Sequence, residues 1–177
     1  LTVAASTINR RFVSRVNLGN GAEYEGSAIN TFDLGDGMHP LIYAGDAPNA
    51  SAGYSSNLSR YCVPGSLDKR LVGGKIVLCD SLSWEVSSGA LRAGALGAIV
   101  QTSFPYMKEF ADVVPLPATL LGMQDGGNIS LYVNSTSQPM ANILRSQEEK
   151  DPRAPFVVFF SSRGPNRMTP NILKPDL

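Results

Sequence analysis

Residues 74–100 constrain the fold more than any other part of the chain, because their apolar pattern changes from that of a strand to that of a helix and back. Residues 75–79 form a short run rich in β-branched side chains between two turns, which is typical of a strand buried on both faces. Apolar residues then recur at helical spacing at Leu82, Val86, Ala90 and Ala93. A second buried strand follows at residues 98–101, so the stretch predicts a parallel strand–helix–strand unit with a right-handed crossover.

The ends of this predicted helix carry capping signals. Ser83 is placed to accept a hydrogen bond from the first free backbone N–H groups, and Gly94 is placed to end the helix in a left-handed conformation. The glycines of the stretch form neither a dinucleotide-binding fingerprint nor a phosphate loop, and the Lys-Ser or Lys-Thr pair of such a loop is missing. The stretch therefore predicts a scaffold, and no cofactor is expected.

The composition is that of a globular chain with no overall charge. Of the 177 residues, 43% are hydrophobic, and 15 basic side chains balance 15 acidic ones. This balance gives no field that would attract nucleic acid or an anionic membrane surface. No apolar run approaches the roughly 18 residues that a membrane helix needs. The length allows one compact unit with parts of a second, and the absence of a leader at Leu1 places any targeting signal outside this chain.

Two cysteines, Cys62 and Cys79, leave three states open: two buried thiols, a disulfide or half of a metal site. A zinc site would need further Cys or His ligands, which His39 alone does not supply. Four Asn-x-Ser/Thr glycosylation sequons are also present, at Asn49, Asn57, Asn128 and Asn134. The sequons and the cysteine pair together favour a secreted protein, in which both modifications form.

Residues 30–40 read as a loop whose polar side chains allow two interpretations. Asp33, Asp36 and His39 lie close enough in sequence to suggest a metal or acid–base site. We favour the alternative, in which Asp and Gly supply turns and His39 is a surface residue. The arginines of residues 7–15 are likewise better explained as the solvated side of a hairpin than as a basic binding patch.

The Asn20-Gly21 pair is a strong hairpin signal, so residues 12–18 should turn back on residues 23–28. Further strands are expected at residues 1–5, 41–44, 115–122 (near an edge, since it is entered through prolines) and 140–144. We also expect an exposed polar loop over residues 47–59 and a turn with a short helix over residues 61–68.

The second half contains one more predicted helix. Asp125 should cap it, and Ile129, Tyr132 and Val133 should form its inner side. In the preceding loop, residues 102–114, an aromatic cluster is expected to fold onto its own small core, with Phe104, Tyr106, Met107 and Phe110 as its members. The charged residues 145–153 indicate a domain boundary. The apolar residues 155–160 are expected to be buried against other parts of the protein.

Both ends of the chain and its middle resemble one protein family. The ends are Leu1-Thr-Val-Ala-Ala-Ser6, Phe160-Ser-Ser-Arg-Gly-Pro-Asn166 and Ile172-Leu-Lys-Pro-Asp176. The middle motifs are Leu41-Ile-Tyr, Cys62-x-Pro-Gly-Ser-Leu-Asp68, Gly74-Lys-Ile-Val-Leu-Cys-Asp80 and Ala93-Gly-Ala-x-Gly-Ala-Ile-Val100. The ends resemble flanking segments of the cucumisin-like subtilases, the subtilisin-like serine proteases of plants. The middle resembles their protease-associated domain, which is inserted into the catalytic domain.

The resemblance implies an α/β fold in three parts. Residues 1–24 and 148–177 would be short strands from a subtilisin-like α/β catalytic domain, and residues 25–147 would form the protease-associated domain with an open mixed sheet. The family's catalytic Asp, His and Asn would lie before Leu1 and its nucleophilic Ser after Leu177. Ser161 and Ser162 belong to a structural turn, so no residue of this chain is expected to be catalytic.

The parent protein implied by the resemblance is a secreted endopeptidase of the apoplast or cell wall. Its inserted domain would shape substrate access or oligomerisation. The expected partners are the remainder of the catalytic domain and protein or peptide substrates. A homodimer is compatible with the resemblance, whereas nucleic acid, membrane, metal and cofactor are not expected.

Two other interpretations remain open from the sequence. One is a stand-alone protease-associated binding module, against which the subtilase-like ends argue. The other is a self-sufficient hydrolase centred on His39, for which the sequence lacks both a Gly-x-Ser-x-Gly elbow and a second base.

We expect Cys62 and Cys79 to be joined by a disulfide. Cys79 ends the first central strand, and residues 67–73 are long enough to return Cys62 to within the roughly 4.4 to 6.8 Å between Cα atoms that a disulfide requires. The sequons and the resemblance, which both indicate secretion, favour this state over free thiols.

Overall fold

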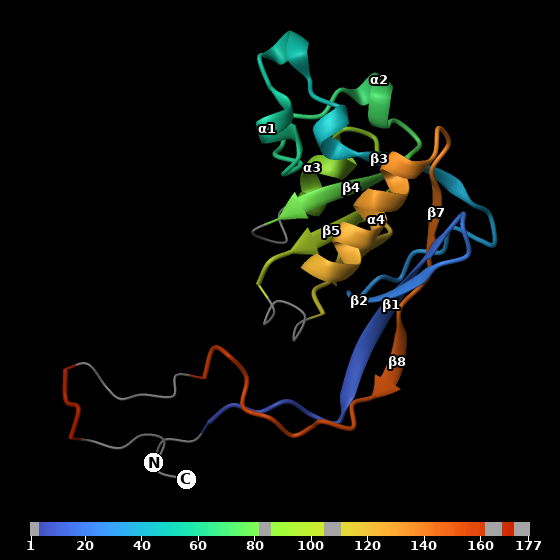
Figure 1. Cartoon of the computed structure of the whole chain (residues 1–177). Coiled ribbons are helices and arrows are strands. Elements are labelled where there is room, and N and C mark those ends of the chain that lie inside the picture. Colours follow the sequence, from blue (N-terminus) through green and yellow to red (C-terminus); the bar gives the residue numbers. More distant parts are fainter. Residues whose placement is uncertain (1–3, 82–85, 105–110, 162–167, 172–177) are drawn as a thin grey trace. The chain divides into compact units, whose positions relative to one another are not determined.

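The computed structural model of the chain divides into two compact units (Figure 1). The structure describes residues 4–81, 86–104, 111–161 and 168–171. The larger unit is Phe12–Gln147, and the smaller unit combines Leu1–Arg11 with Glu148–Leu177. The assignment of residues 25–147 to an inserted domain and of the flanks to a catalytic domain stays a prediction.

The chain forms a mixed β-sheet, of which strands β2 to β7 lie entirely in the larger unit. Its strands are β1 (Arg10–Leu18), β2 (Glu23–Ser27), β3 (His39–Tyr43), β4 (Ile76–Ser81), β5 (Gly97–Thr102), β6 (Ala118–Gly122), β7 (Met140–Ile143) and β8 (Gln147–Lys150). Neighbouring strands follow the order β2-β6-β5-β4-β3-β7-β1-β8. The pairs β3–β4, β4–β5 and β5–β6 are parallel, and the pairs β1–β2, β1–β7, β2–β6 and β3–β7 are antiparallel. The predicted mixed α/β class is confirmed.

The sheet has one more connection, because β2 also pairs with β1. Seven strands, β1 to β7, are therefore linked in a ring. Its narrowest link is the single pair Ser27↔Leu120 between β2 and β6. Gly26 allows this approach, since a Cβ there would lie 2.6 Å from the Leu120 carbonyl oxygen.

The predicted strand–helix–strand unit is present as β4, α3 (Val86–Arg92) and β5. Gly94 has φ +83° and ends α3 as expected. Its N–H donates to the Leu91 carbonyl at 2.9 Å, and the Ala95 N–H donates to the Ala90 carbonyl at 3.1 Å, which is the Schellman pattern. The predicted cap Ser83 and Leu82 lie outside the described residues.

The predicted hairpin is also present, with β1 and β2 paired from Val13↔Ser27 to Asn17↔Glu23. Its turn depends on Gly21, whose φ is +85°, a conformation that glycine adopts without steric cost. The Asn20 side chain supports the turn, because its Oδ1 accepts the Ala22 N–H at 3.0 Å.

The helices before β4 differ from the prediction in two places. The expected polar loop 47–59 contains two short helices, η2 (Ala50–Ala52) and α1 (Ser56–Ser59), and η1 (Ala44–Asp46) ends directly before it. The short helix expected within residues 61–68 lies later in the chain, as α2 (Lys69–Val72), and Asp68 caps it by accepting the Arg70 N–H at 2.9 Å.

The last helix, α4 (Met123–Ser135), is longer than predicted, and Asp125 does not cap it. β6 leads directly into the helix with Gly122 as the N-cap residue, so Asp125 falls inside the first turn. Its charge there still favours the helix dipole. The predicted inner side is confirmed: Ile129 is fully buried, and Tyr132 and Val133 pack on the core.

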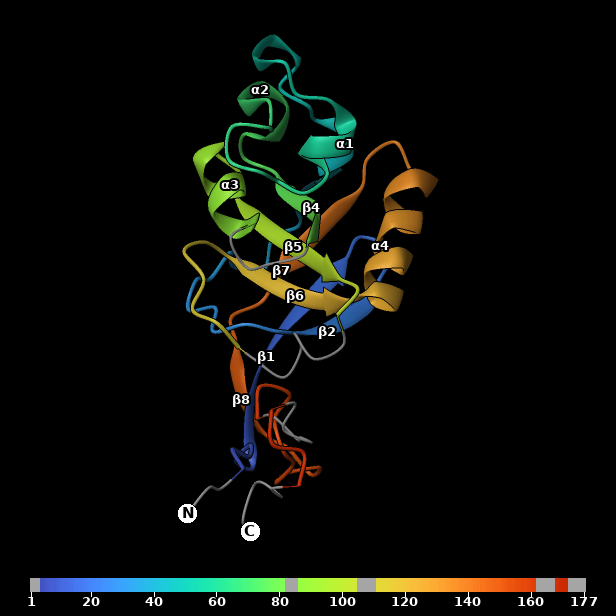
Figure 2. The same ribbon diagram turned by 90° about the vertical axis from the view of Figure 1, so that its left-hand side faces the viewer.

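Two hydrophobic clusters lie on opposite faces of the sheet, because successive strand residues alternate in direction. On β4, Val77 and Cys79 belong to the first cluster, together with residues of α3. Ile76 and Leu78 belong to the second, together with Ile129 of α4. Figure 2 shows α3 and α4 on the two sides of β4 and β5.

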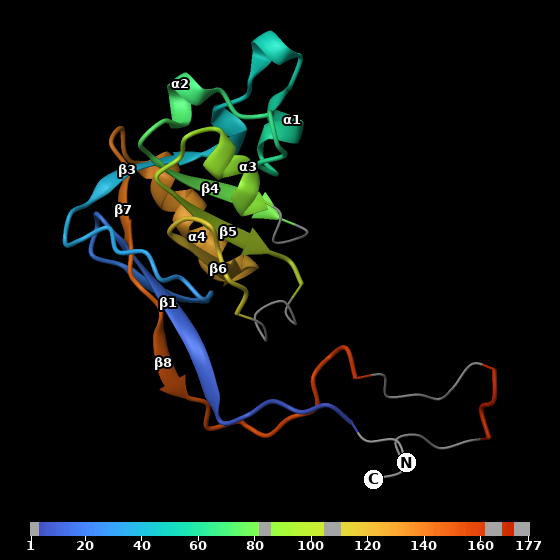
Figure 3. The same cartoon turned by 180° about the vertical axis from the view of Figure 1, so that it is seen from behind.

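The smaller unit is held by backbone bonds and ion pairs between its two chain segments. The Thr7 N–H donates to the Phe156 carbonyl at 3.0 Å, and Ser6 forms a bridge with Val157. β1 and β8 are neighbours (Figure 3), and their side chains form the pairs Arg10–Glu148 and Arg11–Glu149. Within residues 155–160, Val158 is buried, whereas Phe159 and Phe160 are 45% and 57% exposed.

Candidate functional site

The residues around His39 make contacts within their own loop and at the start of β3. His39 begins β3, and its Nε2 lies 3.4 Å from the Leu34 carbonyl oxygen. Asp33 accepts the Gly35 N–H at 2.8 Å, so its carboxylate serves a turn, as in the favoured interpretation. Among the described residues, no group of three or more His, Cys, Asp or Glu side chains could hold a metal ion.

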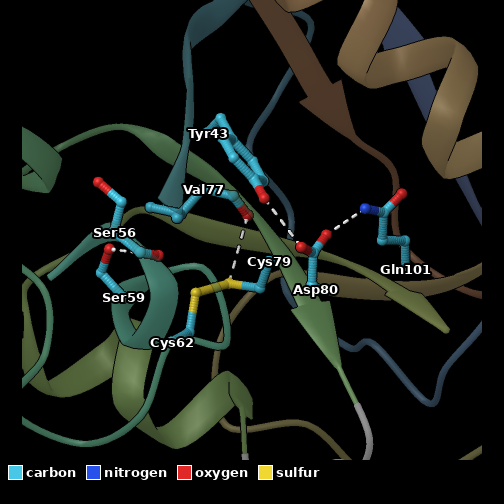
Figure 4. Close-up of a disulfide and its surroundings, with 8 residues drawn as sticks. All are labelled: Tyr43, Ser56, Ser59, Cys62, Val77, Cys79, Asp80 and Gln101. Carbon is cyan, nitrogen blue, oxygen red and sulfur yellow. Dashed lines mark hydrogen bonds between the residues drawn. A yellow bond between two sulfur atoms is a disulfide. The ribbon is translucent and has the colours of Figure 1, made fainter. Parts of the chain in front are cut away.

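Polar side chains instead gather where three parallel strands end. Tyr43, Asp80 and Gln101 stand at the carboxyl ends of β3, β4 and β5, and this edge of a parallel sheet is where α/β proteins usually bind ligands. Asp80 is 6% exposed. The Tyr43 hydroxyl donates to its Oδ2 at 2.8 Å, and the Gln101 amide donates to its Oδ1 (Figure 4).

Arg60 completes this carboxylate cluster, which we define as Tyr43, Arg60, Asp80 and Gln101. Its Nε and Nη2 both donate to Asp80 Oδ2. The Asp80 backbone N–H in turn donates to the Arg60 carbonyl at 2.8 Å. Residue 60 is therefore tied to the end of β4 through both its side chain and its backbone.

A disulfide makes a further link beside the cluster. Cys62 and Cys79 are joined, with Cα atoms 5.8 Å apart, and both are fully buried. Figure 4 shows the cystine next to Asp80 at the end of β4. Cys62 has φ +47°, a left-handed conformation that a residue other than glycine adopts rarely. Together with Arg60, the cystine fixes the segment after α1 onto the sheet.

The hydrogen bonds and charges of this cluster shift the pKa values of Tyr43 and Arg60. Burial raises the pKa of Tyr43 to about 12, and the hydrogen bond to Asp80 and the charge of that carboxylate act in the same direction. The hydrogen bond to Asp80 also raises the pKa of Arg60. The carboxylate accepts from three side chains and so joins the ends of β3, β4 and β5 to Arg60.

Two cavities lie near the sheet. A small one of about 140 Å³ adjoins the carboxylate cluster, between Arg60, Gln101 and Met123. A larger one of about 440 Å³ lies against β3, the turn at residues 137–139 and the last turns of α4. The larger cavity has no catalytic constellation, but it adjoins main-chain groups of β3.

The four sequon asparagines differ in their surroundings. Asn57, Asn128 and Asn134 are exposed, whereas Asn49 is half-buried. The Asn49 amide donates to the Gly65 carbonyl at 3.0 Å, and the Asn134 amide donates to the Ser130 carbonyl at 2.9 Å. Asn57 and Asn128 therefore offer the most accessible side chains for glycosylation.

The sequence reasoning identified the cysteines but missed the carboxylate cluster. Asp80 directly follows the predicted strand 75–79, and Gln101 ends the predicted strand 98–101, so the rule for strand ends could have placed these two together. Nothing in the sequence pattern indicates Arg60, which is positioned by α1 on one side and by the disulfide at Cys62 on the other. In the part of the chain that the structure describes, no helix is long and apolar enough to cross a membrane.

The chain is similar over its whole length to proteases of Arabidopsis thaliana. It is 44% identical to subtilisin-like protease SBT4.3 over 177 residues, which are 100% of this chain and 23% of that protein. It is 41% identical to SBT4.6, with 99% of the chain and 23% of that protein covered, and 38% identical to SBT1.4, with 100% and 22% covered. No family model matches the sequence.

Solved structures give weaker likenesses. An aminopeptidase from Aneurinibacillus sp. strain AM-1 has a TM-score of 0.44 and 15% identity over 84% of this chain and 34% of that one. A zinc aminopeptidase from Bacillus subtilis has a TM-score of 0.46 and 18% identity over the same shares. These TM-scores are too low to support an argument about function. The sequence relatives do support one: the predicted resemblance is confirmed, and the chain is related from end to end to the plant subtilisin-like proteases, of whose length it spans less than a quarter.

Proposed function

We propose that this chain is part of a secreted subtilisin-like serine endopeptidase and that its larger unit is a protease-associated insert that shapes substrate access or oligomerisation. The observation that carries the proposal is the 44% identity over all 177 residues to a protease more than four times as long. The catalytic Asp, His, Asn and Ser would then be supplied by the rest of the parent protein. The buried disulfide and the exposed sequon asparagines support an extracellular location.

The geometry of the larger unit favours a structural role in the parent protein over a catalytic one. Its buried carboxylate Asp80 accepts from Tyr43, Arg60 and Gln101. Its two core clusters lie within the unit itself. A stand-alone binding module is the second candidate function, and the self-contained core of residues 12–147 is the observation that favours it.

An exchange experiment tests the proposal. The matching segment of SBT4.3 is replaced by this chain, and the chimaera is expressed in plant cells beside the wild-type enzyme and an active-site Ser→Ala control. Secretion and cleavage of a fluorogenic peptide at a rate within about tenfold of wild type are expected. A chimaera that is secreted and folded but inactive would contradict the proposal, as would this chain being found as a complete secreted protein in its source tissue.

A further inference from the structure

Helix α4 turns one side away from the sheet of the larger unit (Figure 2). Its inner side packs on the second hydrophobic cluster through Ile129. Residues that recur at i, i+4, i+7 and i+11 share one side of a helix. Four exposed residues of α4 have this spacing, namely Gln124, Asn128, Leu131 and Ser135. We call this stripe the outer face of α4.

Leu131 is the apolar member of the outer face, and it is 71% exposed. One exposed leucine is common on a protein surface. The feature that distinguishes Leu131 is the asparagine three residues before it, because side chains at i and i+3 of a helix are neighbours with Cβ atoms about 5–6 Å apart. A large group attached to Asn128 would therefore lie over Leu131.

Asn128 begins the glycosylation sequon Asn128-Ile-Ser130. Its side chain is exposed and makes no hydrogen bond to another described residue. Asn49 and Asn134 differ, because each donates its side-chain amide to a main-chain carbonyl. The Asn49 Oδ1 also accepts the hydroxyl of Ser51, the third residue of its own sequon, at 2.8 Å. Of the two sequon asparagines on α4, Asn128 is therefore the one whose amide the fold does not use.

We propose that an N-linked glycan on Asn128 covers the outer face of α4 and keeps this face out of protein interfaces. N-linked glycans are bulky and hydrated, so a partner cannot pack on the helix side that carries one. If the larger unit shapes oligomerisation, the contact then lies on another part of its surface. The glycan at the same time shields Leu131, the apolar side chain that would otherwise favour association at this face.

The modification is a transfer of a whole oligosaccharide to the side-chain amide. The Asn128 Nδ2 forms a bond to the C1 atom of the first sugar, which is supplied as a lipid-diphosphate-linked oligosaccharide. The bond from C1 to the phosphate oxygen breaks, the lipid diphosphate leaves, and the amide loses one proton. Because eukaryotic cells make this transfer in the secretory pathway, the inference rests on the secretion that is part of the proposed function.

The first test uses the full chain behind a signal peptide in plant cells, which directs it through the secretory pathway wherever its parent protein is located. Digestion of the secreted protein in H₂¹⁸O with an N-glycosidase that acts on plant glycans leaves an ¹⁸O-labelled Asp at each glycosylated position. Mass spectrometry should find this label at residue 128 in most molecules. Unlabelled Asn128 in the secreted protein would overturn the proposal, whereas a parent protein retained inside its own cells would count against the proposed function alone.

Substitutions at Ser130 make the assignment specific. Ser130→Ala should abolish the label at residue 128 because the sequon loses its hydroxyl, and Ser130→Thr should keep it. Both variants leave the sequon of Asn57 intact, so labelling there should not change. A label at residue 128 that persists in Ser130→Ala would report spontaneous deamidation in place of a glycan and would overturn the proposal.

Static light scattering tests whether the glycan covers the face. Ser130→Ala, which lacks the glycan at residue 128, should associate more than the wild type, with about twofold more light scattered per unit mass for a dimer. Adding Leu131→Gln to Ser130→Ala should return the scattering to the wild-type value. Equal scattering by Ser130→Ala and the wild type would overturn the shielding, and a dimer of the glycosylated wild type that Leu131→Gln dissociates would make the outer face an interface.

Discussion

Replacing Gly89 by alanine should destabilise the fold, although helix propensity alone predicts the opposite. Gly89 lies in α3, where alanine would gain up to about 1 kcal/mol over glycine. A Cβ on Gly89, however, would lie 1.8 Å from the Cys62 carbonyl oxygen and 3.0 Å from its carbonyl carbon. The closer of these distances is 1.6 Å short of the 3.4 Å at which ordinary van der Waals contact begins.

The clash is difficult to relieve because the obstacle is backbone that is held in place. Cys62 is bonded to Cys79 on the central strand, and Arg60 is tied to Asp80 through backbone and side chain. Overpacking of this kind usually costs about 1–3 kcal/mol. After the propensity gain is allowed for, we expect a net loss of up to about 2 kcal/mol, which corresponds to a fall in Tm of up to about 4–8 °C for a chain of this size.

The matched control is Gly127→Ala in α4. A Cβ at Gly127 meets nothing within 4 Å, so only the propensity gain remains, and Tm should rise by about 1–4 °C. Thermal unfolding followed by circular dichroism compares both variants with the wild type. If Gly89→Ala unfolded at or above the wild-type temperature, the reasoning would be refuted.

A double-mutant cycle locates the cause of the effect. In a background in which Cys62 and Cys79 are both replaced by Ser, the Cys62 carbonyl is free to move away, so the cost of Gly89→Ala should shrink by at least about 1 kcal/mol. An unchanged cost in that background would mean that the disulfide does not hold the obstacle.

Four further predictions concern the cystine, Tyr43, catalysis and association. Reduction of the Cys62–Cys79 bridge, whose partners are 17 residues apart, should remove about 3 kcal/mol of stability in denaturant titrations, and two freely alkylatable cysteines in secreted protein would contradict the bridge. Since the pKa of Tyr43 is raised to about 12, the contribution of the protonated Tyr43 to the free energy of unfolding is complete below pH ~10 and is lost between pH ~10 and 12. Tyr43→Phe should therefore flatten the fall in stability between these pH values, and an unchanged slope in this variant would contradict the prediction. A serine-directed phosphonate should leave the chain unlabelled, and stoichiometric labelling of any serine here would show the opposite. The chain trimmed to residues 12–147 should scatter less light than the whole chain, because Phe159 and Phe160 expose apolar surface; if the whole chain were better behaved, that surface would not drive association.

Local patterns in the sequence predicted most of the fold. The β-branched run at residues 75–79, the Asn20-Gly21 turn and the helix stop at Gly94 each depend on short-range physics, and each is confirmed. Asp125 was assigned as a cap because the sequence does not show that β6 runs into α4 without a loop. The ring of seven strands could not be predicted, since it depends on the long-range pair Ser27↔Leu120.

The candidate site was predicted less completely. The two cysteines were recognisable from their types, but the carboxylate cluster combines three strand ends with Arg60, which is distant from them in sequence.

The two ends of the larger unit lie next to each other, and this has a consequence for how such a unit can be carried by another protein. Near its first residue and near its last, the Leu144 N–H donates to the Arg15 carbonyl at 2.8 Å, and Arg15 also bonds Gln147. A chain that leaves beside the point where it came in can replace a turn of a host protein without stretching the host, and the loop-closure entropy grows only slowly with the number of residues added. The 136 residues from Phe12 to Gln147 could therefore be gained or lost by a host at a single surface turn while the strands on either side keep their positions.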